Sequence, residues 1–317
     1  MPFILLNRMK IGATFSDNRP SVAAIGFFDG VHRGHRYLIE QVREAASLRR
    51  LAASVVTFPV HPRRVTQPDC QLRLLTTCQE KTDLLAATGV DTCLMLDFTP
   101  WLASLSARDF MSILKRRYQI AVLVIGYDHR FGHNRSEGFE DYMRYGQELG
   151  MEVVPARAFS DRIGGKDVNI SSSWIRRLLA DGRVEEANEA LGYDYFLQGT
   201  VVSGHQVGRR LGFPTANVQV NSPDKLIPAD GVYAVWVDVD GCRWGGMLSI
   251  GRRPTLGNGP ERSIEVNLFG FHADIYQHAL RVTFVARTRG ERKFGSLEEL
   301  VAQLHKDEAE VKSLLQG

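Results

Sequence analysis

The apolar residues of this chain follow two different spacings, and the change between them divides the sequence. In the first half, short and nearly continuous apolar runs alternate with amphipathic stretches. The runs cover 21–25, 51–58, 92–96, 120–125 and 152–157, and the stretches cover 36–48, 79–88, 106–117 and 138–149. Continuous apolar runs are typical of strands that are buried on both faces of a parallel sheet. The alternation therefore predicts a Rossmann-like α/β domain whose ligand binds at the carboxyl ends of the strands.

From about residue 196 onward, short strands follow one another without helices between them. These runs cover 196–202, 231–239, 244–250, 263–269 and 280–286. Asp240-Gly241 lies between two of them and predicts a hairpin turn. This spacing favours an antiparallel barrel or sandwich. The stretch 297–315 is amphipathic and predicts a closing helix.

The length of the chain also indicates two domains. A chain of 317 residues is longer than one hydrophobic core usually serves. A helical stretch at 172–191 joins the two patterns, with no glycine- and serine-rich linker. We place the boundary inside this stretch, which gives domains of residues 1–187 and 188–317.

The charge and the cysteines limit the kind of partner that we expect. Lys and Arg number 39 against 36 Asp and Glu, so nothing in the net charge of +3 calls for nucleic acid or a membrane. The N-terminal apolar run is too short for a signal peptide, and no segment approaches a membrane span. The cysteines lack C-x-x-C spacing, which predicts reduced thiols in a cytoplasmic protein. We expect small-molecule ligands and a monomer or weak homo-oligomer.

The turn that follows the first apolar run carries the densest chemistry. Residues 26–35 read Gly-Phe-Phe-Asp-Gly-Val-His-Arg-Gly-His and precede a helix. A strand, turn and helix in this order direct backbone N–H groups and the positive end of the helix dipole at one spot, which suits phosphate. His32 and His35 are three residues apart, so they share a face at the helix start. Three glycines would let the backbone turn tightly and approach a ligand closely: Gly26, Gly30 and Gly34.

An alternative reading of this turn needs no ligand. A single histidine near a helix start is more often a cap or a surface residue than a catalyst. Two histidines with interleaved glycines favour nucleotide chemistry over that reading. The turn lacks the lysine and hydroxyl residue of a P-loop, and it does not follow the G-x-G-x-x-G pattern of dinucleotide folds.

A second candidate segment, residues 170–176, combines three consecutive serines with an arginine. Serine is a common helix N-cap, and a cap needs no ligand. Alternatively, Arg176 reaches a phosphate from the first helical turns with its planar fork. The residues alone leave these two readings even.

The second half has one comparably dense stretch, residues 199–217. Gly204, Gly208 and Gly212 recur every four residues, a spacing that a simple loop between strands also explains. Thr215 and Asn217 alternate with Ala216, so on a strand they face the same way. Two neutral oxygen ligands beside a glycine-rich loop suit Mg²⁺ that is held mainly by nucleotide phosphates and water.

Segments of both halves resemble one known family. Residues 26–35, 126–132 and 170–176 are similar to the signature segments of the adenylyltransferase module in prokaryotic bifunctional riboflavin kinase/FAD synthetases. The segments 57–62, 75–81 and 105–110 extend this resemblance over roughly residues 21–190. The run Gly-x-Pro-Thr-Ala-Asn ending at Asn217 resembles the riboflavin kinase module of the same family, and that match extends over 196–311.

For the first half, the resemblance implies a nucleotidyl transfer. FMN would attack the α-phosphorus of ATP, release pyrophosphate and become FAD. A phosphate nucleophile is already ionised at pH 7, so positioning and charge stabilisation would supply most of the catalysis. His32 and His35 would hold the α-phosphate region, and Ser171, Ser172 and Arg176 would hold the β- and γ-phosphates.

The resemblance also implies supporting roles around the turn. Asp29 would either orient the turn or contact the nucleotide through a metal ion, and the residues leave this choice open. Asp128 would lie on the flavin side of the cleft. The other residues expected to bind nucleotide are Gly26, Phe28, Gly30 and Gly34.

For the second half, the resemblance implies a small β-barrel that phosphorylates riboflavin with MgATP. Glu265 would be the general base for the 5′-hydroxyl, although by itself it reads as a solvated glutamate on an edge strand. Thr215 and Asn217 would hold Mg²⁺. Gly204, Gly208 and Gly212 would approach ATP. Arg289 is assigned to the flavin side, where it would neutralise phosphate or anchor a closing loop.

The chain departs from the family pattern at several positions. Phe27 stands where Thr or Asn is frequent, and His129 stands where Phe is usual. In the second half, the departures include Ser249, Asn267 and Gly270. None of them removes a phosphate-binding group, so we expect both reactions, with altered flavin affinity.

Overall fold

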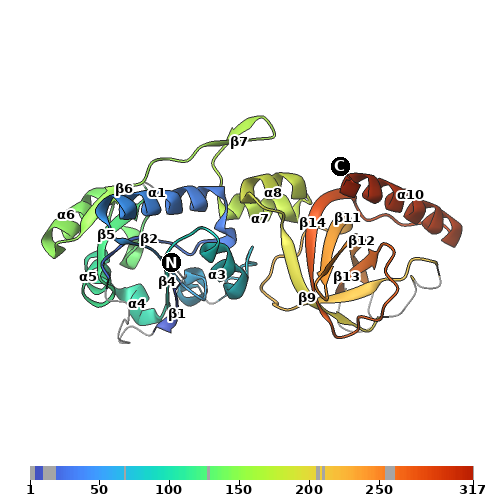
Figure 1. Ribbon diagram of the computed structural model, residues 1–317, viewed down its shortest axis with the longest axis horizontal. Helices are drawn as coiled ribbons and strands as arrows, with labels where there is room; N and C mark the ends of the chain where they lie inside the picture. The colour runs from blue at the N-terminus through green and yellow to red at the C-terminus, as the bar shows by residue number, and fades with distance from the viewer. Residues whose placement is uncertain are drawn as a thin grey trace. The chain divides into compact units, whose positions relative to one another are not determined.

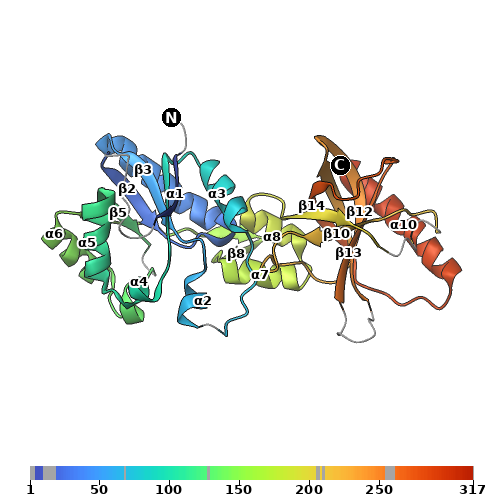
Figure 2. The same cartoon turned by 90° about the horizontal axis from the view of Figure 1, so that it is seen from below.

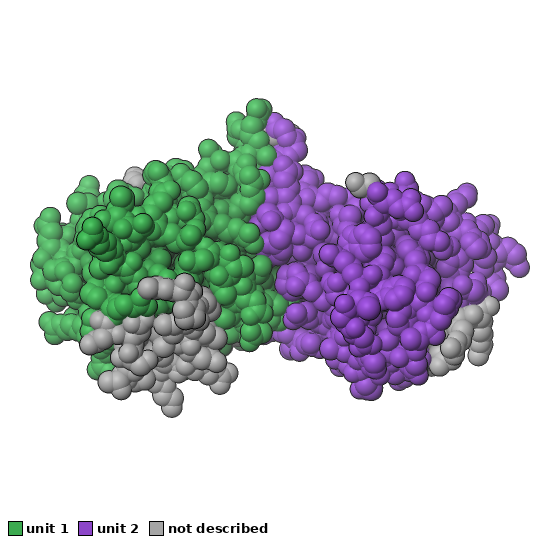
Figure 3. Space-filling model, in the orientation of Figure 1, with its two compact units in different colours: residues 1–162, 167–171 green, residues 163–166, 172–317 purple. Residues whose placement is uncertain are grey.

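The chain forms two compact units, which Figure 3 distinguishes by colour. The computed structural model describes residues 4–9, 19–67, 69–126, 129–204, 208, 211–253 and 261–316. The first unit comprises residues 1–162 and 167–171, and the second comprises 163–166 and 172–317. The helical stretch 172–191 lies wholly in the second unit, whereas the predicted boundary divides it. The domain limits 1–187 and 188–317 stay a prediction.

The first unit is built on a parallel sheet of six strands, in the order β1-β4-β3-β2-β5-β6 (Figure 1). The strands are β1 (Ile4–Met9), β2 (Ser21–Ile25), β3 (Ala52–Thr57), β4 (Thr92–Leu96), β5 (Ile120–Ile125) and β6 (Glu152–Pro155). The predicted α/β class with a parallel sheet is confirmed, and five of the strands follow the apolar runs. β1 was missed because its sequence, ILLNRM, mixes polar residues into a short apolar run. It pairs with β4 at the edge of the sheet.

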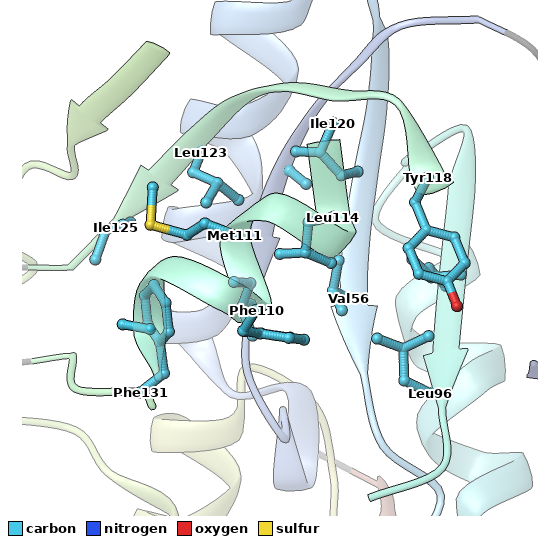
Figure 4. Packing of buried hydrophobic residues seen from close by; sticks show 14 of the residues in the cluster. Val56, Leu96, Phe110, Met111, Leu114, Tyr118, Ile120, Leu123, Ile125 and Phe131 are labelled. Atoms are coloured by element: carbon cyan, nitrogen blue, oxygen red, sulfur yellow. The ribbon is translucent and has the colours of Figure 1, made fainter. Parts of the chain in front are cut away.

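Helices contribute to an apolar cluster on each face of this sheet. α1 (Arg33–Arg49) and α3 (Cys78–Ala86) supply Ile39, Val42 and Leu85 to one cluster. α5 (Ala107–Tyr118) and α6 (Phe139–Leu149), which lie together in Figure 2, supply residues to the other, where Phe110 and Met111 pack near β5 (Figure 4). The short elements are η1 (Asp29–Val31), α2 (Pro62–Thr66), α4 (Pro100–Ser104), η2 (His133–Arg135), β7 (Asp161–Ile163) and β8 (Lys166–Val168).

The second unit is a closed antiparallel barrel in the order β10-β13-β12-β11-β14-β9. Its strands are β9 (Phe196–Val202), β10 (Ala216–Val220), β11 (Gly231–Val239), β12 (Cys242–Arg253), β13 (Glu261–Leu268) and β14 (Ala279–Arg289). The predicted choice between barrel and sandwich is therefore resolved as a barrel. Asp240 and Gly241 both have positive φ angles, of 51° and 74°, and connect β11 to β12 as the predicted hairpin turn.

Helices on either side of the strands in the chain pack on this barrel. α7 (Ser172–Ala180) and α8 (Val184–Leu191) precede it, and α10 (Leu297–Gln316) follows it, as predicted. The backbone N–H of Ala229 donates to Leu179 O at 2.9 Å, and Arg287 donates from its guanidinium to Asp181 O, so α7 is tied to the barrel directly. Within the described part of the chain, no helix is long and apolar enough to cross a membrane.

Candidate active sites

The turn after β2 has the strained geometry that its glycines predict. Phe28 adopts a left-handed conformation with φ of 56°, and Gly30 has φ of 80°. The turn ends at His32, which is the N-cap of α1, because its Nδ1 accepts a hydrogen bond from the backbone N–H of His35 at 3.3 Å. The capping alternative is thus real for His32. The same hydrogen bond also sets the tautomer of His32, because a neutral ring that accepts at Nδ1 carries its proton on Nε2.

His32 and His35 form a stacked pair at the start of α1. Their ring centroids are 3.6 Å apart, with 17° between the planes. The pKa of His35 is lowered well below 6.5, first by burial and then by the charges of His32, Lys81 and His129. Nδ1 of His35 is buried and has no hydrogen-bond partner among the described residues. The free protein therefore holds His35 as a neutral imidazole beside a helix N-terminus.

Asp29 ties this turn to the segment before α3. Its carboxylate is only 2 % exposed. It accepts hydrogen bonds from the backbone N–H of Leu75 at 2.9 Å and of Thr76 at 3.1 Å. The N–H of Gly30 donates in turn to the hydroxyl of Thr76 at 3.1 Å. Of the two roles predicted for Asp29, these contacts favour orienting the turn.

Phe28 supports the turn from below. Its ring is 2 % exposed and meets the ring of His35 edge-on at 5.2 Å. The side chain is therefore not presented for stacking on a base, and any contact of Phe28 with nucleotide would come from its backbone. Phe27, the first departure from the family pattern, packs edge-on against His61 with centroids 4.5 Å apart.

Sequence reasoning missed Lys81 as a functional candidate. Its Nζ donates to the backbone oxygen of Phe27 at 3.1 Å and of Phe58 at 2.6 Å, and the residue is 1 % exposed. Burial lowers the pKa of its ammonium group to about 8. A lysine on an amphipathic helix usually lies on the solvent face, so the pattern gave no sign of burial. The only signal was its place at the end of the segment 75–81.

The loop after β5 lies at the same edge of the sheet, because β5 pairs with β2. Asp128, the predicted flavin-side residue, lies outside the described residues. His129 follows it, and its Nε2 is buried without a hydrogen-bond partner among the described residues. Burial and the charges of Arg135 and Arg130 lower the pKa of His129 to about 4. His129 is within electrostatic reach of His35, so it joins the pair at this edge.

The serine–arginine segment belongs to two units. Ser171 ends the first unit, and Ser172 begins α7 in the second. Arg176 lies one turn into α7, where its guanidinium donates to the hydroxyl of Ser173 at 3.3 Å. The predicted action of Ser171, Ser172 and Arg176 with the two histidines stays a prediction.

In the barrel, the structure brings Thr215, Asn217 and Glu265 together. The hydroxyl of Thr215 donates to Glu265 Oε2 at 3.1 Å. Asn217 on β10 pairs in register with Glu265 on β13. Ser249 on β12 is the partner of Glu265 on the other side, so this departure lies next to the carboxylate. Asn267, another departure, donates to Pro214 O at 2.7 Å and supports the backbone before Thr215.

Two glycines approach this group closely. A Cβ on Gly204 would lie 2.0 Å from Asn217 Nδ2, and one on Gly208 would lie 2.3 Å from Phe213 O. Both positions therefore require glycine for reasons of space. Gly212 has φ of 84°, which favours glycine on conformational grounds. Gly270 has φ of 69°, which also favours glycine and accounts for this departure from the family pattern.

Arg289 holds the last helix. Its guanidinium contacts both carboxylate oxygens of Asp307, at 2.7–3.1 Å, and donates to Gly290 O at 3.0 Å. Asp307 is fully buried and also accepts from Gln303 at 2.8 Å. These contacts tie the end of β14 to α10, and the predicted place of Arg289 on the flavin side stays a prediction.

The donor atoms of the barrel group suit Mg²⁺. Thr215, Asn217 and Glu265 offer only oxygen ligands of the kind that Mg²⁺ prefers, and they leave positions for phosphate and water. Among the described residues, no group of three or more His, Cys, Asp and Glu residues is placed to hold a metal ion.

Comparison with known proteins identifies both domains of the chain. A family model for FAD synthetase matches residues 14–173, and one for riboflavin kinase matches residues 191–315. Bifunctional riboflavin kinase/FMN adenylyltransferases are similar along nearly the whole chain. The protein of Listeria monocytogenes is 37 % identical over 92 % of this chain and 91 % of its own length. The corresponding values are 35 %, 92 % and 91 % for Bacillus subtilis, and 37 %, 90 % and 90 % for Escherichia coli K12.

A crystal structure described as a macrolide-efflux protein from Streptococcus pneumoniae also matches. It has a TM-score of 0.87 and 32 % sequence identity, and the match covers 98 % of both chains. The family models, the curated relatives and the two groups of side chains agree. The chain belongs to the bifunctional riboflavin kinase/FMN adenylyltransferase family, with a FAD synthetase domain ahead of a riboflavin kinase domain.

Proposed function

We propose that the barrel phosphorylates riboflavin to FMN with MgATP and that the α/β unit adenylylates FMN to FAD. The observation that carries the first step is the junction of Thr215, Asn217 and Glu265 across β10 and β13. The second step rests on the stacked His32–His35 pair at the N-terminus of α1.

In the kinase reaction, Glu265 accepts the proton of the riboflavin 5′-hydroxyl while the hydroxyl oxygen attacks the γ-phosphorus of ATP. The bond from the γ-phosphorus to the bridging oxygen breaks, and ADP leaves. The Thr215 hydroxyl, which donates to Glu265 Oε2, orients the carboxylate. Thr215 and Asn217 would hold Mg²⁺, which, when bound, neutralises charge on the ATP phosphates.

In the adenylyl transfer, a phosphate oxygen of FMN attacks the α-phosphorus of ATP and pyrophosphate leaves. No proton has to be removed from the nucleophile. The chain therefore contributes positioning and hydrogen-bond donors, which are the N–H groups at the start of α1 and Nε2–H of His32. Arg176 would neutralise charge on the departing pyrophosphate, and the hydroxyls of Ser171 and Ser172 would donate hydrogen bonds to it.

We also propose that both reactions take place in the cytoplasm. The four cysteines, Cys70, Cys78, Cys93 and Cys242, are all free thiols. Free thiols are usual where the compartment is reducing.

Glu265→Gln and His32→Asn test the two sites separately. The first change should lower kcat for FMN formation by roughly 10²–10⁴-fold and leave FAD formation from FMN intact. The second should lower kcat/KM for FAD formation by roughly 10²-fold and leave the kinase intact. Asparagine can still cap α1, so this variant removes the imidazole with little loss of helix stability. Product chromatography in assays of each half-reaction gives both results.

Asp238→Asn is the control for Glu265→Gln, and His133→Ala is the control for His32→Asn. Each control changes a residue of the same chemical type in the same unit, at an exposed or partly exposed site. Both controls should keep both activities. A Glu265→Gln protein that still forms FMN at the wild-type rate rules out the proposed base. A wild-type protein that forms FAD from FMN but no FMN from riboflavin would have only the adenylyltransferase activity.

A further inference from the structure

Lys81 connects the ends of two neighbouring strands, one of which leads into the turn at residues 26–35. It lies on α3, and its ammonium group donates to backbone oxygens of Phe27, just beyond β2, and of Phe58, just beyond β3. β2 and β3 are neighbours in the sheet. The same ammonium group lies 3.9 Å from the centroid of the Phe27 ring. Lys81 therefore closes the sheet edge from which the residues of the turn project.

The hydrogen bonds of Lys81 do not by themselves explain why a charged side chain is buried at this position. The residue is 1 % exposed, its hydrogen bonds go to neutral carbonyl oxygens, and no salt bridge to it is found in the described part of the chain. The attractions that favour its charged form come, largest first, from Cys78, Asp29 and Cys93, and burial outweighs them. A buried charge without a directly paired carboxylate is expensive, and an apolar side chain of the same size would usually be as stable.

This charge acts on the histidine pair. Lys81, His32 and His129 are the groups whose charges bear on His35, and all of them disfavour its protonated form. The stacked geometry adds to this effect, because two imidazolium rings 3.6 Å apart repel each other. The negative charge of an incoming phosphate instead favours the protonated form of His35. The phosphate itself is attracted by Lys81 and by the N-terminal end of α1.

We propose that Lys81 is a positioning residue for adenylyl transfer: it fixes the strand ends that carry the turn and places a buried positive charge behind the His32–His35 pair. This inference rests on the proposed function of that pair. Lys81 does not touch the substrate. Its hydrogen bonds set the shape of the turn, and its charge adds to burial and to His32 in disfavouring the protonated form of His35.

Three substitutions separate the shape from the charge. Lys81→Met keeps the length and removes both, Lys81→Gln keeps hydrogen-bond donors without the charge, and Lys81→Arg keeps the charge. Lys306→Met, on the exposed face of α10, is the control. Each full-length variant is assayed for FAD formation from FMN and ATP between pH 5 and 9. Riboflavin phosphorylation by the same preparation shows that the barrel unit has folded, and hydrogen exchange of the β5 amides shows that the first unit has folded.

We expect Lys81→Met and Lys81→Gln to lower kcat/KM for FAD formation by at least about tenfold at pH 7, since they weaken the field on the phosphates. Without Lys81, the titration of the pair should appear in the kcat/KM profile at a pH higher by about half a unit to one unit. Lys81→Arg should keep the wild-type pH profile below about pH 8, where Lys81 carries its charge, and the kinase should be unchanged in all variants.

The proposal is overturned if Lys81→Met or Lys81→Gln, with the kinase intact, forms FAD with the kcat/KM and the pH profile of the wild type. It is also overturned if both lose activity by the same factor at every pH, because that result indicates packing alone. If Lys81→Met does not fold, Lys81→Gln decides. A wild-type protein that forms no FAD at any pH would instead refute the proposed function.

Discussion

At the scale of single residues, the adenylyl-transfer site is built from polar groups that were buried at a cost. Asp29, Lys81 and His32 are each at most 4 % exposed. Asp29 and His32 were found from the turn itself, because glycines and paired histidines are visible in a sequence. Lys81 was not, because burial of a lysine depends on two backbone oxygens that come from other segments.

His129 should make the first unit sensitive to acid. Its pKa is lowered from 6.5 to about 4, so the unfolded chain binds a proton that the folded chain does not. Its contribution is unaffected above pH 6.5, and the free energy of unfolding falls as the pH drops from there towards 4. At pH 5 the loss should be about 2 kcal/mol.

Hydrogen exchange of β5 amides at pH 7 and pH 5 measures this loss in the wild type and in His129→Phe. The phenylalanine variant should lose about 2 kcal/mol less than the wild type over that interval. His133→Phe, at an exposed site, should behave as the wild type. Equal losses in the wild type and His129→Phe would show that His129 titrates normally.

At the scale of elements, periodicity predicted the buried strands better than the edges. β2 to β5 are visible as apolar runs because nearly all of their residues are buried, and the other edge strand, β6, was found although it is only partly buried. β1 is an edge strand, and its mixed sequence resembles a loop. The barrel could not be told from a sandwich, because closure depends on the pairing of β10 with β13 and of β9 with β14, which local patterns do not encode.

The role of Arg289 shows why a residue's pattern and its partner have to be considered together. The predicted strand 280–286 ends before Arg289, and Asp307 lies 18 residues further on, on a helix that reads as amphipathic. The buried pair joins the end of β14 to α10. The anchoring role therefore comes from tertiary structure.

Asp307→Ala should loosen α10 by leaving the Arg289 guanidinium without its partner. The cost should be about 3 kcal/mol in the free energy of unfolding. Urea titration followed by tryptophan fluorescence, to which Trp236 and Trp244 of the barrel contribute, measures the change. Glu308→Ala, which removes the exposed pair with Lys312 on the same helix, should cost less than about 1 kcal/mol. An unchanged midpoint for Asp307→Ala would contradict the anchoring role.

At the scale of the whole molecule, each domain of the chain carries out one ATP-dependent step. The two groups of side chains share no residue, and they meet different chemical needs. Glu265 removes a proton from an alcohol, whereas the His32–His35 pair meets a nucleophile that is already ionised. FMN is the product of one step and the substrate of the other, so it must leave the barrel before it becomes FAD.

Mixing two variants, each of which should lack one of the two activities, tests this claim most directly. Glu265→Gln and His32→Asn are incubated separately and together with riboflavin and MgATP, and FMN and FAD are separated by chromatography over time. We expect almost no FMN or FAD from Glu265→Gln alone, FMN without FAD from His32→Asn alone, and FAD after a lag from the mixture. A mixture that forms no FAD, or a single substitution that abolishes both half-reactions, would contradict two independent sites in one chain.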